Sequence, residues 1–536
     1  MALIGSRVRQ RPTWPSIALR PEPPFSSILG AALAAGTAVA LSLPPFGWWP
    51  LAIVGLAGLA ACLHRRPWWQ RAALGAAAGF GQFAIGLWWV TEFSVPGYAV
   101  LVLLSMLFVA AACAAVASWR PVGILLGLPA TLTLLEWVRG HVPFGGLPLG
   151  GIPLGQAAGP LAAVARVGGP VLLTGATAAT AAAMAVMARS VVSRGHESEA
   201  SGDGVGDTRG RRAGPLSAAA AAVVLVAVVA LVAAGRLGPD GSGGGPPRSI
   251  RVAAVQGGGP RGLRANQADP NSVFQRQVVA TAALRPPLDL VVWPEDVVSV
   301  DRPVAETPEA ATVAQLAQRL AATVVAGVVE DVGSDRFRNA AVAWSPAGVI
   351  VARYDKVHRV PFGEYIPGRS LFRRLANLDL VPRDAIAGHG PGLLDIGVAP
   401  LGAVISYEVF FPDRARAAIN AGGQLLLIPT NASSYRTSQV PTQEVAAAQL
   451  RAWETGRDAI QAAPTGYSAL IDHDGRVLVR STLGREQAIT GMLTLRTGRT
   501  WYGRFGDFPT LAMAIVALAA TVGGIRARFR QSRKPR

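Results

Sequence analysis

Four side chains that suit nucleophilic and acid–base chemistry follow three apolar strand-like runs in this chain. Glu295 comes directly after Val-Val-Trp-Pro, where the proline is expected to end a buried strand. Lys356 and Glu364 lie in a polar, turn-rich connection that follows a second apolar run. Ser406 ends a third run, Val-Ile-Ser-Tyr-Glu. A carboxylate, an amine and a hydroxyl brought to one sheet edge can serve as base, oxyanion partner and nucleophile.

Two of these residues, Glu295 and Lys356, also have an interpretation without a catalytic role. Glu295 can be a solvated acid at a strand end, although partial burial there would favour a general base. Lys356 can be an ordinary exposed loop lysine. The long pattern Tyr-x-Lys-x-His-x-Val-Pro-Phe-Gly-Glu-Tyr-x-Pro, residues 354–367, is specific enough to favour the functional interpretation of the lysine.

The composition places these residues in a membrane protein. The chain has 536 residues, of which 51% are hydrophobic and 15% charged, with a mean hydropathy of +0.36. This mixture predicts several membrane spans and more than one domain. The net charge of +18 does not indicate nucleic-acid binding, because the basic residues are not gathered in one patch. Cys62 and Cys113 both lie in apolar runs and have no metal-ligand spacing.

Apolar runs long enough to approach a bilayer span are concentrated before residue 236. They are expected at 27–45, 47–62, 70–91, 98–119, 121–138, 167–188 and 216–235, with one more at 509–525. A spanning helix needs about 20 apolar residues, so the two shortest runs are marginal. The sequence therefore predicts a membrane domain over 1–236 with about seven spans, and a last span at 509–525.

Basic residues in the short loops predict the orientation of these spans. The arginines before the first run place the N-terminus in the cytoplasm, and those of 526–536 place the basic C-terminal tail there too. With eight spans, the long region between the seventh and eighth lies outside the cytoplasm. Residues 190–215 are expected to form a disordered cytoplasmic loop, and residues 237–249 a flexible linker.

The pattern changes from residue 250 onward. Short runs rich in Val, Ile and Ala predict strands at 250–256, 288–293, 323–329, 339–345, 349–354, 399–407, 424–429, 459–471 and 487–494. Helix-like segments at 270–284, 306–321, 411–421 and 441–456 alternate with some of them. Apolar strands alternating with helices predict one layered α/β domain over 250–500.

The order glutamate, lysine, nucleophile on three strand ends resembles the nitrilase, or CN hydrolase, superfamily. With the membrane segments, the chain resembles the apolipoprotein N-acyltransferase family over most of its length. That resemblance implies a four-layer αββα domain on the extracytoplasmic side of a bacterial plasma membrane. It implies two-step acyl transfer from a membrane phospholipid to the α-amino group of the diacylglyceryl-cysteine of lipoproteins, with no cofactor or metal and no nucleic-acid partner. Catalytic positions fall on Glu295, Lys356 and Ser406.

The same resemblance assigns supporting or substrate-binding positions to five further residues. They are Glu364, Tyr407, Glu408, Trp293 and Asn431. It also extends to the segment Glu-Trp-Val-Arg-Gly at 136–140, where Glu136 and Arg139 form either a pair that locks a helix end or a contact for a lipid headgroup.

Ser406 departs from the family pattern, which has a cysteine nucleophile at this position. A serine hydroxyl is a weak nucleophile unless a base acts on it directly. Glu295 can activate the serine, giving an oxygen-ester intermediate, or the chain is a catalytically inactive membrane scaffold that binds lipid or a partner. A soluble-type nitrilase acting on a small nitrile or amide is a further alternative, but it would not need membrane spans.

Overall fold

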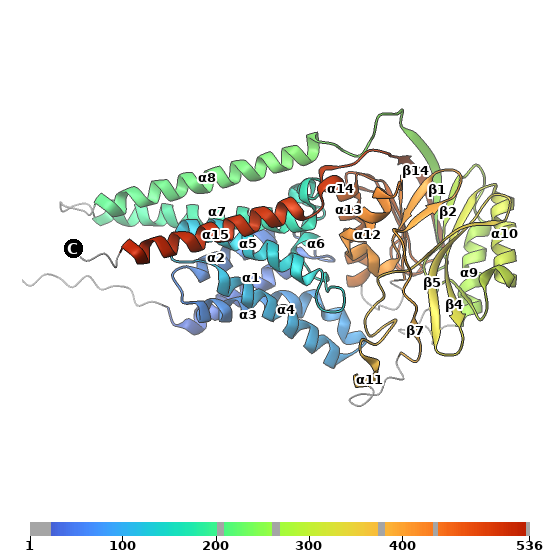
Figure 1. Cartoon of the computed structure of the whole chain (residues 1–536), viewed down its shortest axis with the longest axis horizontal. Coiled ribbons are helices and arrows are strands. Elements are labelled where there is room, and N and C mark those ends of the chain that lie inside the picture. The colour runs from blue at the N-terminus through green and yellow to red at the C-terminus, as the bar shows by residue number, and fades with distance from the viewer. Residues whose placement is uncertain (1–22, 201–207, 260–268, 373–380, 432–437, 532–536) are drawn as a thin grey trace, which may run out of the picture.

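The computed structural model describes residues 23–200, 208–259, 269–372, 381–431 and 438–531. All eight apolar runs lie on helices, which pack side by side in one half of the molecule (Figure 1). These helices are α1 (Phe25–Ser42), α2 (Pro50–Leu63), α3 (Trp68–Gly86), α4 (Val95–Ala115), α5 (Pro121–Arg139), α7 (Ala165–Ala200), α8 (Thr208–Leu237) and α15 (Phe508–Gln531). Short helical turns connect them: η1 (Trp88–Glu92), α6 (Ile152–Gln156) and η2 (Pro160–Val164).

Five helical segments are long and apolar enough to cross a membrane. They are Phe25–Ser42, Val95–Ala115, Pro121–Arg139, Pro160–Val191 and Leu216–Leu237. The apolar parts of α2 and α15 are shorter, and α3 carries Gln70, Arg71 and Gln82 among its apolar residues. The expected count of eight spans therefore stays a prediction.

Both expected flexible connections are more ordered than their composition indicates. The segment 190–215 is helical at both ends, because α7 continues to Ala200 and α8 begins at Thr208. Its Ala, Arg and Glu residues favour helix once a neighbouring turn exists to extend. Residues 201–207 lie outside the described residues, as do residues 1–22 with their arginines. Similarly, α15 extends to Gln531, so the first part of the basic tail is helical.

The linker at 237–249 lies against the α/β half instead of hanging free. Asp240 forms an ion pair with Arg496 at 3.1 Å, and the backbone N–H of Gly498 donates to the carbonyl of Gly241 at 2.9 Å. Gly241 has φ +84, and a Cβ there would lie 2.6 Å from the carbonyl oxygen of Gly456. A side chain at this position is excluded on both grounds.

Two sheets form the centre of the other half. The first has eight strands, six of which follow the order β14 (Gln487–Leu495), β1 (Arg248–Gln256), β2 (Leu290–Val292), β4 (Thr323–Val332), β5 (Arg336–Trp344), β6 (Ile350–Asp355). The other two are short: β3 (Val298–Val300) pairs with β4, and β7 (Asp384–Ala385) pairs with β5. The second has six strands, with the order β13 (Val477–Arg480), β12 (Ala469–Ile471), β11 (Ala459–Ala462), β10 (Leu426–Pro429), β9 (Pro400–Ala403), β8 (Leu393–Asp395).

Three hydrophobic cores define the layers of this half. Alternate residues of both sheets, among them Val292 and Leu427, pack together between the sheets. On the outer face of the first sheet, α9 (Pro270–Ala282) and α10 (Pro308–Leu320) cover a second core that contains Phe274. On the outer face of the second sheet lie α12 (Pro412–Asn420) and α13 (Gln439–Thr455). The αββα arrangement expected from the resemblance is present.

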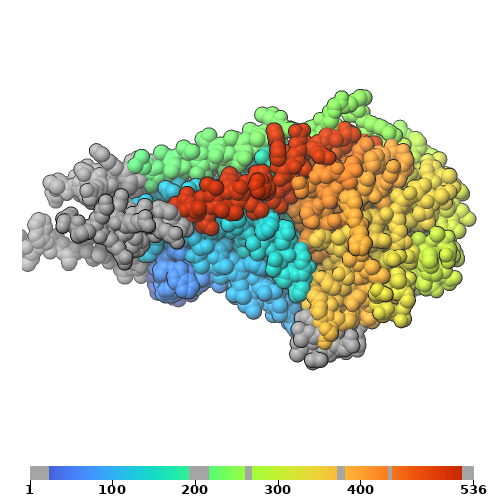
Figure 2. Space-filling model, in the orientation of Figure 1, coloured from blue at the N-terminus to red at the C-terminus, as the bar shows by residue number. Residues whose placement is uncertain are grey.

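The helices α12 and α13 lie between the sheets and the helical half, while α9 and α10 lie at the far end (Figure 1). The two halves touch without a gap on the face shown in Figure 2. Gln439 of α13 donates to the carbonyl of Ile85 at 2.8 Å and accepts from the backbone N–H of Trp89 at 3.2 Å. Arg166 at the start of α7 forms an ion pair with Asp474 at 2.9 Å. The C-terminal end of α3 and the turn η1 therefore lie at the end of the helical half that faces the second sheet.

Candidate active site

Glu295 reaches the site because its loop passes very close to strand β4. The chain leaves β2 at Val292, and the backbone N–H of Gly327 donates to the carbonyl of Pro294 at 3.1 Å. A Cβ on Gly327 would lie 2.3 Å from that carbonyl oxygen and 2.5 Å from the Cα of Glu295. Only glycine permits this crossing, which leaves the Glu295 side chain 4% exposed at the sheet edge.

Lys356 is held between two carboxylates. Its ammonium nitrogen donates at 2.8 Å to Oε1 of Glu295 and at 2.8 Å to Oε1 of Glu364. Burial alone would lower the pKa of Lys356, but the two carboxylates raise it above its usual range. The lysine, 1% exposed, is therefore a permanent cation. A fixed, buried cation of this kind can stabilise a developing oxyanion.

Asn339 completes this cluster and was not expected from the sequence. Its Nδ2 donates to Oε1 of Glu295 at 2.8 Å and to Oε1 of Glu364 at 3.1 Å. The amide fixes the two carboxylates relative to each other. The only hint in the sequence is a polar residue that directly precedes the apolar part of β5, Ala-Ala-Val-Ala-Trp.

Glu364 is oriented by its own loop. Its Oε2 accepts from the backbone N–H of Val360 at 2.8 Å, and its backbone N–H donates to the carbonyl of Val360 at 2.8 Å. Phe362, between them, has φ +61, as the tight turn requires. This loop leaves Oε1 of Glu364 directed at Lys356.

Ser406 stands at the turn that follows β9. Its φ of +50 is uncommon for a residue with a Cβ, and it is the first residue of a 3-10 turn over Ser406–Phe410. Such a strained strand-to-helix turn projects a nucleophile away from the sheet in many hydrolases. Within the part of the chain that the structure describes, no hydrogen bond engages the hydroxyl of Ser406, which leaves it available to a base.

Glu408 ties the serine turn to the lysine loop. Its Oε2 accepts from the backbone N–H of Ile405 at 2.8 Å, and its Oε1 accepts from the backbone N–H of Val357 at 2.8 Å. The hydroxyl of Tyr354 donates to the same carboxylate at 2.9 Å. With 0% exposure and these partners, Glu408 fixes the distance between Ser406 and Lys356 without itself reaching substrate.

The remaining expected residues take different positions. Tyr407 donates to the carbonyl of Gly146 at 3.2 Å, so it contacts the helical half. Asn431 donates to Asp296, the neighbour of Glu295, at 3.3 Å. Trp293 corrects our expectation: it is 0% exposed and packs edge-on against Phe274 in the core beneath α9. Strand alternation sends the Trp293 side chain to the outer face of the sheet, so it does not line the site.

The loop after α5 brings the helical half to the site. Phe144 meets Phe362 of the lysine loop in an edge-on contact with ring centroids 5.7 Å apart, and both rings are largely exposed. Two exposed aromatic rings beside the lysine loop provide an apolar surface at the junction of the two halves.

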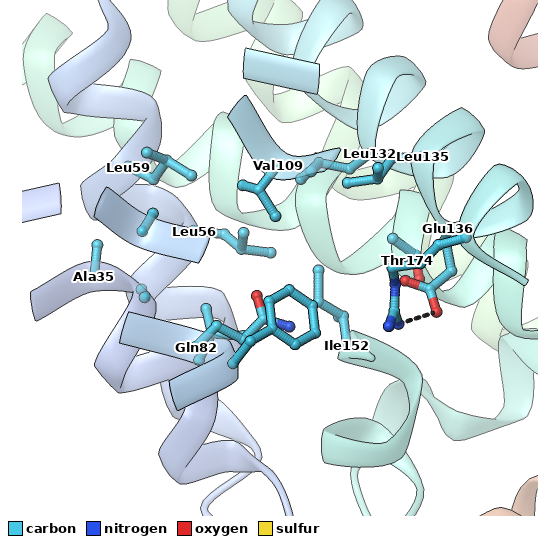
Figure 3. Close-up of a pocket in the computed structure, with 16 residues that line it drawn as sticks. Ala35, Leu56, Leu59, Gln82, Val109, Leu132, Leu135, Glu136, Ile152 and Thr174 are labelled. Carbon is cyan, nitrogen blue, oxygen red and sulfur yellow. Dashed lines mark hydrogen bonds and ion pairs between the residues drawn. The ribbon is translucent and has the colours of Figure 1, made fainter. Parts of the chain in front are cut away.

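Arg139, the last residue of α5, fixes the conformation of this loop through hydrogen bonds to its backbone. Its guanidinium, 2% exposed, donates to the carbonyls of Leu147 and Leu149 at 2.6 and 2.7 Å and to Glu136 at 3.2 Å. The cavity beside this pair measures about 20 Å³, and its lining includes Thr174 and Gln82 (Figure 3). That volume holds a water molecule but no lipid headgroup. Of the two interpretations of Glu136 and Arg139, the structure favours an ion pair that fixes the end of the helix over a contact for a lipid headgroup.

Family models match both halves of the chain. The apolipoprotein N-acyltransferase N-terminal domain matches residues 35–183, and carbon-nitrogen hydrolase matches residues 251–502. No group of three or more His, Cys, Asp or Glu side chains that could hold a metal ion occurs among the residues described.

Full-length relatives carry the name apolipoprotein N-acyltransferase. The protein of Azotobacter vinelandii is 31% identical over 95% of this chain and 95% of its own length. The protein of Methylococcus capsulatus is 31% identical over 94% of this chain and 96% of its own. Among solved structures, one similar protein is Nit3 of Saccharomyces cerevisiae, a member of the nitrilase superfamily. The match covers 46% of this chain and 90% of the Nit3 chain, with 19% identity and a TM-score of 0.36.

Proposed function

This chain belongs to the apolipoprotein N-acyltransferase family, and we propose that its site transfers a fatty acyl chain from a membrane phospholipid to the α-amino group of the diacylglyceryl-cysteine of lipoproteins, through an ester on Ser406. The observation that carries this mechanism is one buried lysine held by two carboxylates, joined through Glu408 to a strained serine turn. A scaffold without chemistry would have no need for two buried charges and a third, partly buried one in a single cluster, since each is costly to remove from water.

In the first step, Glu295 takes the proton of the Ser406 hydroxyl as the oxygen attacks the ester carbonyl of the phospholipid. Oε1 of Glu295 is engaged by Lys356 and Asn339, and Oε2 has no hydrogen bond among the described residues. Oε2 is thus the atom that accepts the proton. Lys356 stabilises the oxyanion, and Glu295 returns the proton to the departing lysophospholipid oxygen.

In the second step, the α-amino group of the lipoprotein attacks the ester on Ser406. Glu295 accepts a proton from the amine. The bond between the acyl carbon and the serine oxygen then breaks, and Glu295 returns the proton to that oxygen. The amide product leaves with the acyl chain. Glu364 keeps Lys356 in position through both steps, while Asn431 holds the loop of Glu295 through Asp296.

We further propose that the chain spans a bacterial plasma membrane with its α/β domain outside the cytoplasm and both termini inside. The basic loop residues Arg65 and Arg66 lie beside Ser118 and thus near Arg120, at the end away from the α/β domain. The opposite end, which meets that domain through Gly86 and Trp89, carries no such residues in its loops at 44–50 and 91–97.

Exposed tryptophans support the same placement. Trp68, Trp69 and Trp119 lie at the basic end, with exposed fractions of 66, 53 and 58%. Trp48 and Trp88 lie at the other end, with exposed fractions of 58 and 59%. Belts of this kind mark the two membrane–water interfaces. The site, next to Phe144, then opens at the membrane surface where both lipid-anchored substrates reside.

Intact-protein mass spectrometry after incubation with phospholipid tests this mechanism. We expect a mass gain of one acyl group that alkaline hydroxylamine removes, that Ser406→Ala abolishes, and that a diacylglyceryl peptide discharges. The absence of both adduct and transfer would favour the inactive scaffold. Transfer that survives Ser406→Ala would overturn the role given to Ser406.

A further inference from the structure

Glu444 is a buried carboxyl that the two steps above do not use. It lies in the second turn of α13 and is 4% exposed. Its Oε1 accepts a hydrogen bond from the hydroxyl of Thr430 at 2.6 Å. Its Oε2 is buried and has no hydrogen-bond partner among the described residues. A buried polar atom without a partner is costly, so its presence calls for an explanation.

The position of Thr430 brings this carboxyl to the edge of the site. Strands β9 and β10 are parallel, with Ala403 paired to Leu427. Ser406 follows the carboxyl end of β9 and Thr430 follows the carboxyl end of β10, so both residues lie at the same edge of the second sheet. The charged groups that act on Glu444 from the neighbouring elements are Glu295 and Lys356. Glu444 therefore lies within electrostatic reach of Glu295 and Lys356.

The surroundings keep Glu444 protonated at neutral pH. Burial raises the pKa of Glu444 to about 8, and the negative charge of Glu295 adds to this effect. The hydrogen bond from Thr430 and the positive charge of Lys356 lower the pKa, but by less. A neutral acid also tolerates the unpaired Oε2 far better than a carboxylate would.

We propose that Glu444 is a positioning residue that stays neutral during acylation, orients Thr430 at the sheet edge that carries Ser406, and keeps a second negative charge away from the reacting atoms. This inference rests on the acyl transfer proposed above. Negative charge develops first on the oxygen of Ser406 and then on the substrate carbonyl oxygen. An ionised Glu444 at the same edge would repel both, and a serine, which yields its proton less readily than a cysteine, is sensitive to that repulsion.

The pH dependence of acylation by the full-length protein in phospholipid vesicles tests the proposal. We expect the single-turnover rate to fall above about pH 8 in the unsubstituted protein. Glu444→Gln should keep the rate at pH 7 within about threefold and lack the alkaline fall, because the amide accepts from Thr430 and cannot ionise. Thr430→Val should move the fall to higher pH, because it removes the hydrogen bond that favours the ionised form.

Two results would overturn the proposal. One is an alkaline fall that persists unchanged in Glu444→Gln, which would place the ionisation elsewhere. The other is a loss of more than about tenfold at pH 7 in Glu444→Gln, which would mean that Glu444 itself must exchange a proton.

Infrared spectroscopy separates this inference from the proposed function, since it needs no turnover. In the difference spectrum between the unsubstituted protein and Glu444→Gln at pH 7, which cancels the contribution of Glu454, we expect the carbonyl stretch of one protonated carboxyl, and we expect it to be lost above about pH 8. Absence of that band beside normal acyl transfer would overturn only the role of Glu444. A protein that transfers no acyl group would overturn the proposed function, and with it the role in acylation, even with the band present.

Discussion

The ammonium nitrogen of Lys356 lies 2.8 Å from Oε1 of Glu295, and the two side chains follow β6, at the edge of the first sheet, and β2, which β4 and β5 separate from β6. Glu364 binds the same nitrogen at 2.8 Å, so two negative charges share one positive charge and the cluster carries a net charge of −1. Because the cluster is buried, each charge depends on the others for its stability. That dependence makes the site easy to break by a single substitution.

Replacement of Lys356 by methionine should abolish transfer and destabilise the protein. The substitution leaves Glu295 and Glu364 as neighbouring carboxylates without a cation, and breaking a buried pair in this way costs about 3–5 kcal/mol. Thermal unfolding and acyl transfer, measured together in detergent, check both parts. The double variant Glu364→Gln with Lys356→Met should recover part of the stability but no activity. Normal transfer by Lys356→Met would remove the lysine from the mechanism.

Ser406→Cys should form an acyl-enzyme more readily than the unsubstituted protein does. A thiol loses its proton at a much lower pH than a hydroxyl, so less is required of Glu295. The adduct would be a thioester, which hydroxylamine cleaves at neutral pH, whereas the serine ester needs alkali. Mass spectrometry before and after the two treatments distinguishes them. An inert cysteine variant with intact folding would show that the site no longer supports acylation.

Gly327→Ala should lower activity strongly, although residue 327 touches no substrate. The added Cβ would lie 2.3 Å from the carbonyl oxygen of Pro294, so the loop that carries Glu295 has to shift. Displacement by about 1 Å commonly costs two orders of magnitude in rate. Gly244→Ala is the matched control, since nothing lies within 4 Å of a Cβ there. Equal rates for the two variants would contradict the close crossing at Gly327.

The free energy of unfolding of Glu454→Gln should rise relative to that of the unsubstituted protein between about pH 5 and pH 8. Burial raises the pKa of Glu454 to about 7, with Arg451 opposing and Asp507 adding to the shift, from an ordinary value of 4.5. A raised pKa means that the native state holds the proton longer than the unfolded state. The stabilisation from the neutral acid is complete below pH 4.5 and is lost as the pH rises through about 7.

Unfolding temperatures of both proteins across this pH range measure the effect. Glu306→Gln provides a control, because that side chain is exposed and its variant should differ from the unsubstituted protein by the same small amount at every pH. A difference for Glu454→Gln that stays constant with pH would show that Glu454 is ionised throughout.

Local patterns in the sequence were sufficient for the elements and for the residues at their ends. The apolar runs before residue 236 all lie on helices, because a helix satisfies its own backbone hydrogen bonds and needs only apolar side chains outside. The strand ends before Glu295 and Ser406 followed from Pro294 and from the end of an apolar run. One expected strand, 459–471, is in fact two antiparallel strands, β11 and β12, separated by a turn with Pro464 and Gly466.

Sequence patterns alone were therefore enough to divide the chain into apolar helices and an α/β domain and to identify the glutamate, the lysine and the serine of the site. Which side chains contact one another became clear from the packing of the folded chain. It brought Asn339 between Glu295 and Glu364, made Glu408 a link between two loops, placed Glu444 behind Thr430, and turned Trp293 into the core. These contacts join residues far apart in the chain, and strand pairing and sheet packing, which fix them, have no signature in any single segment.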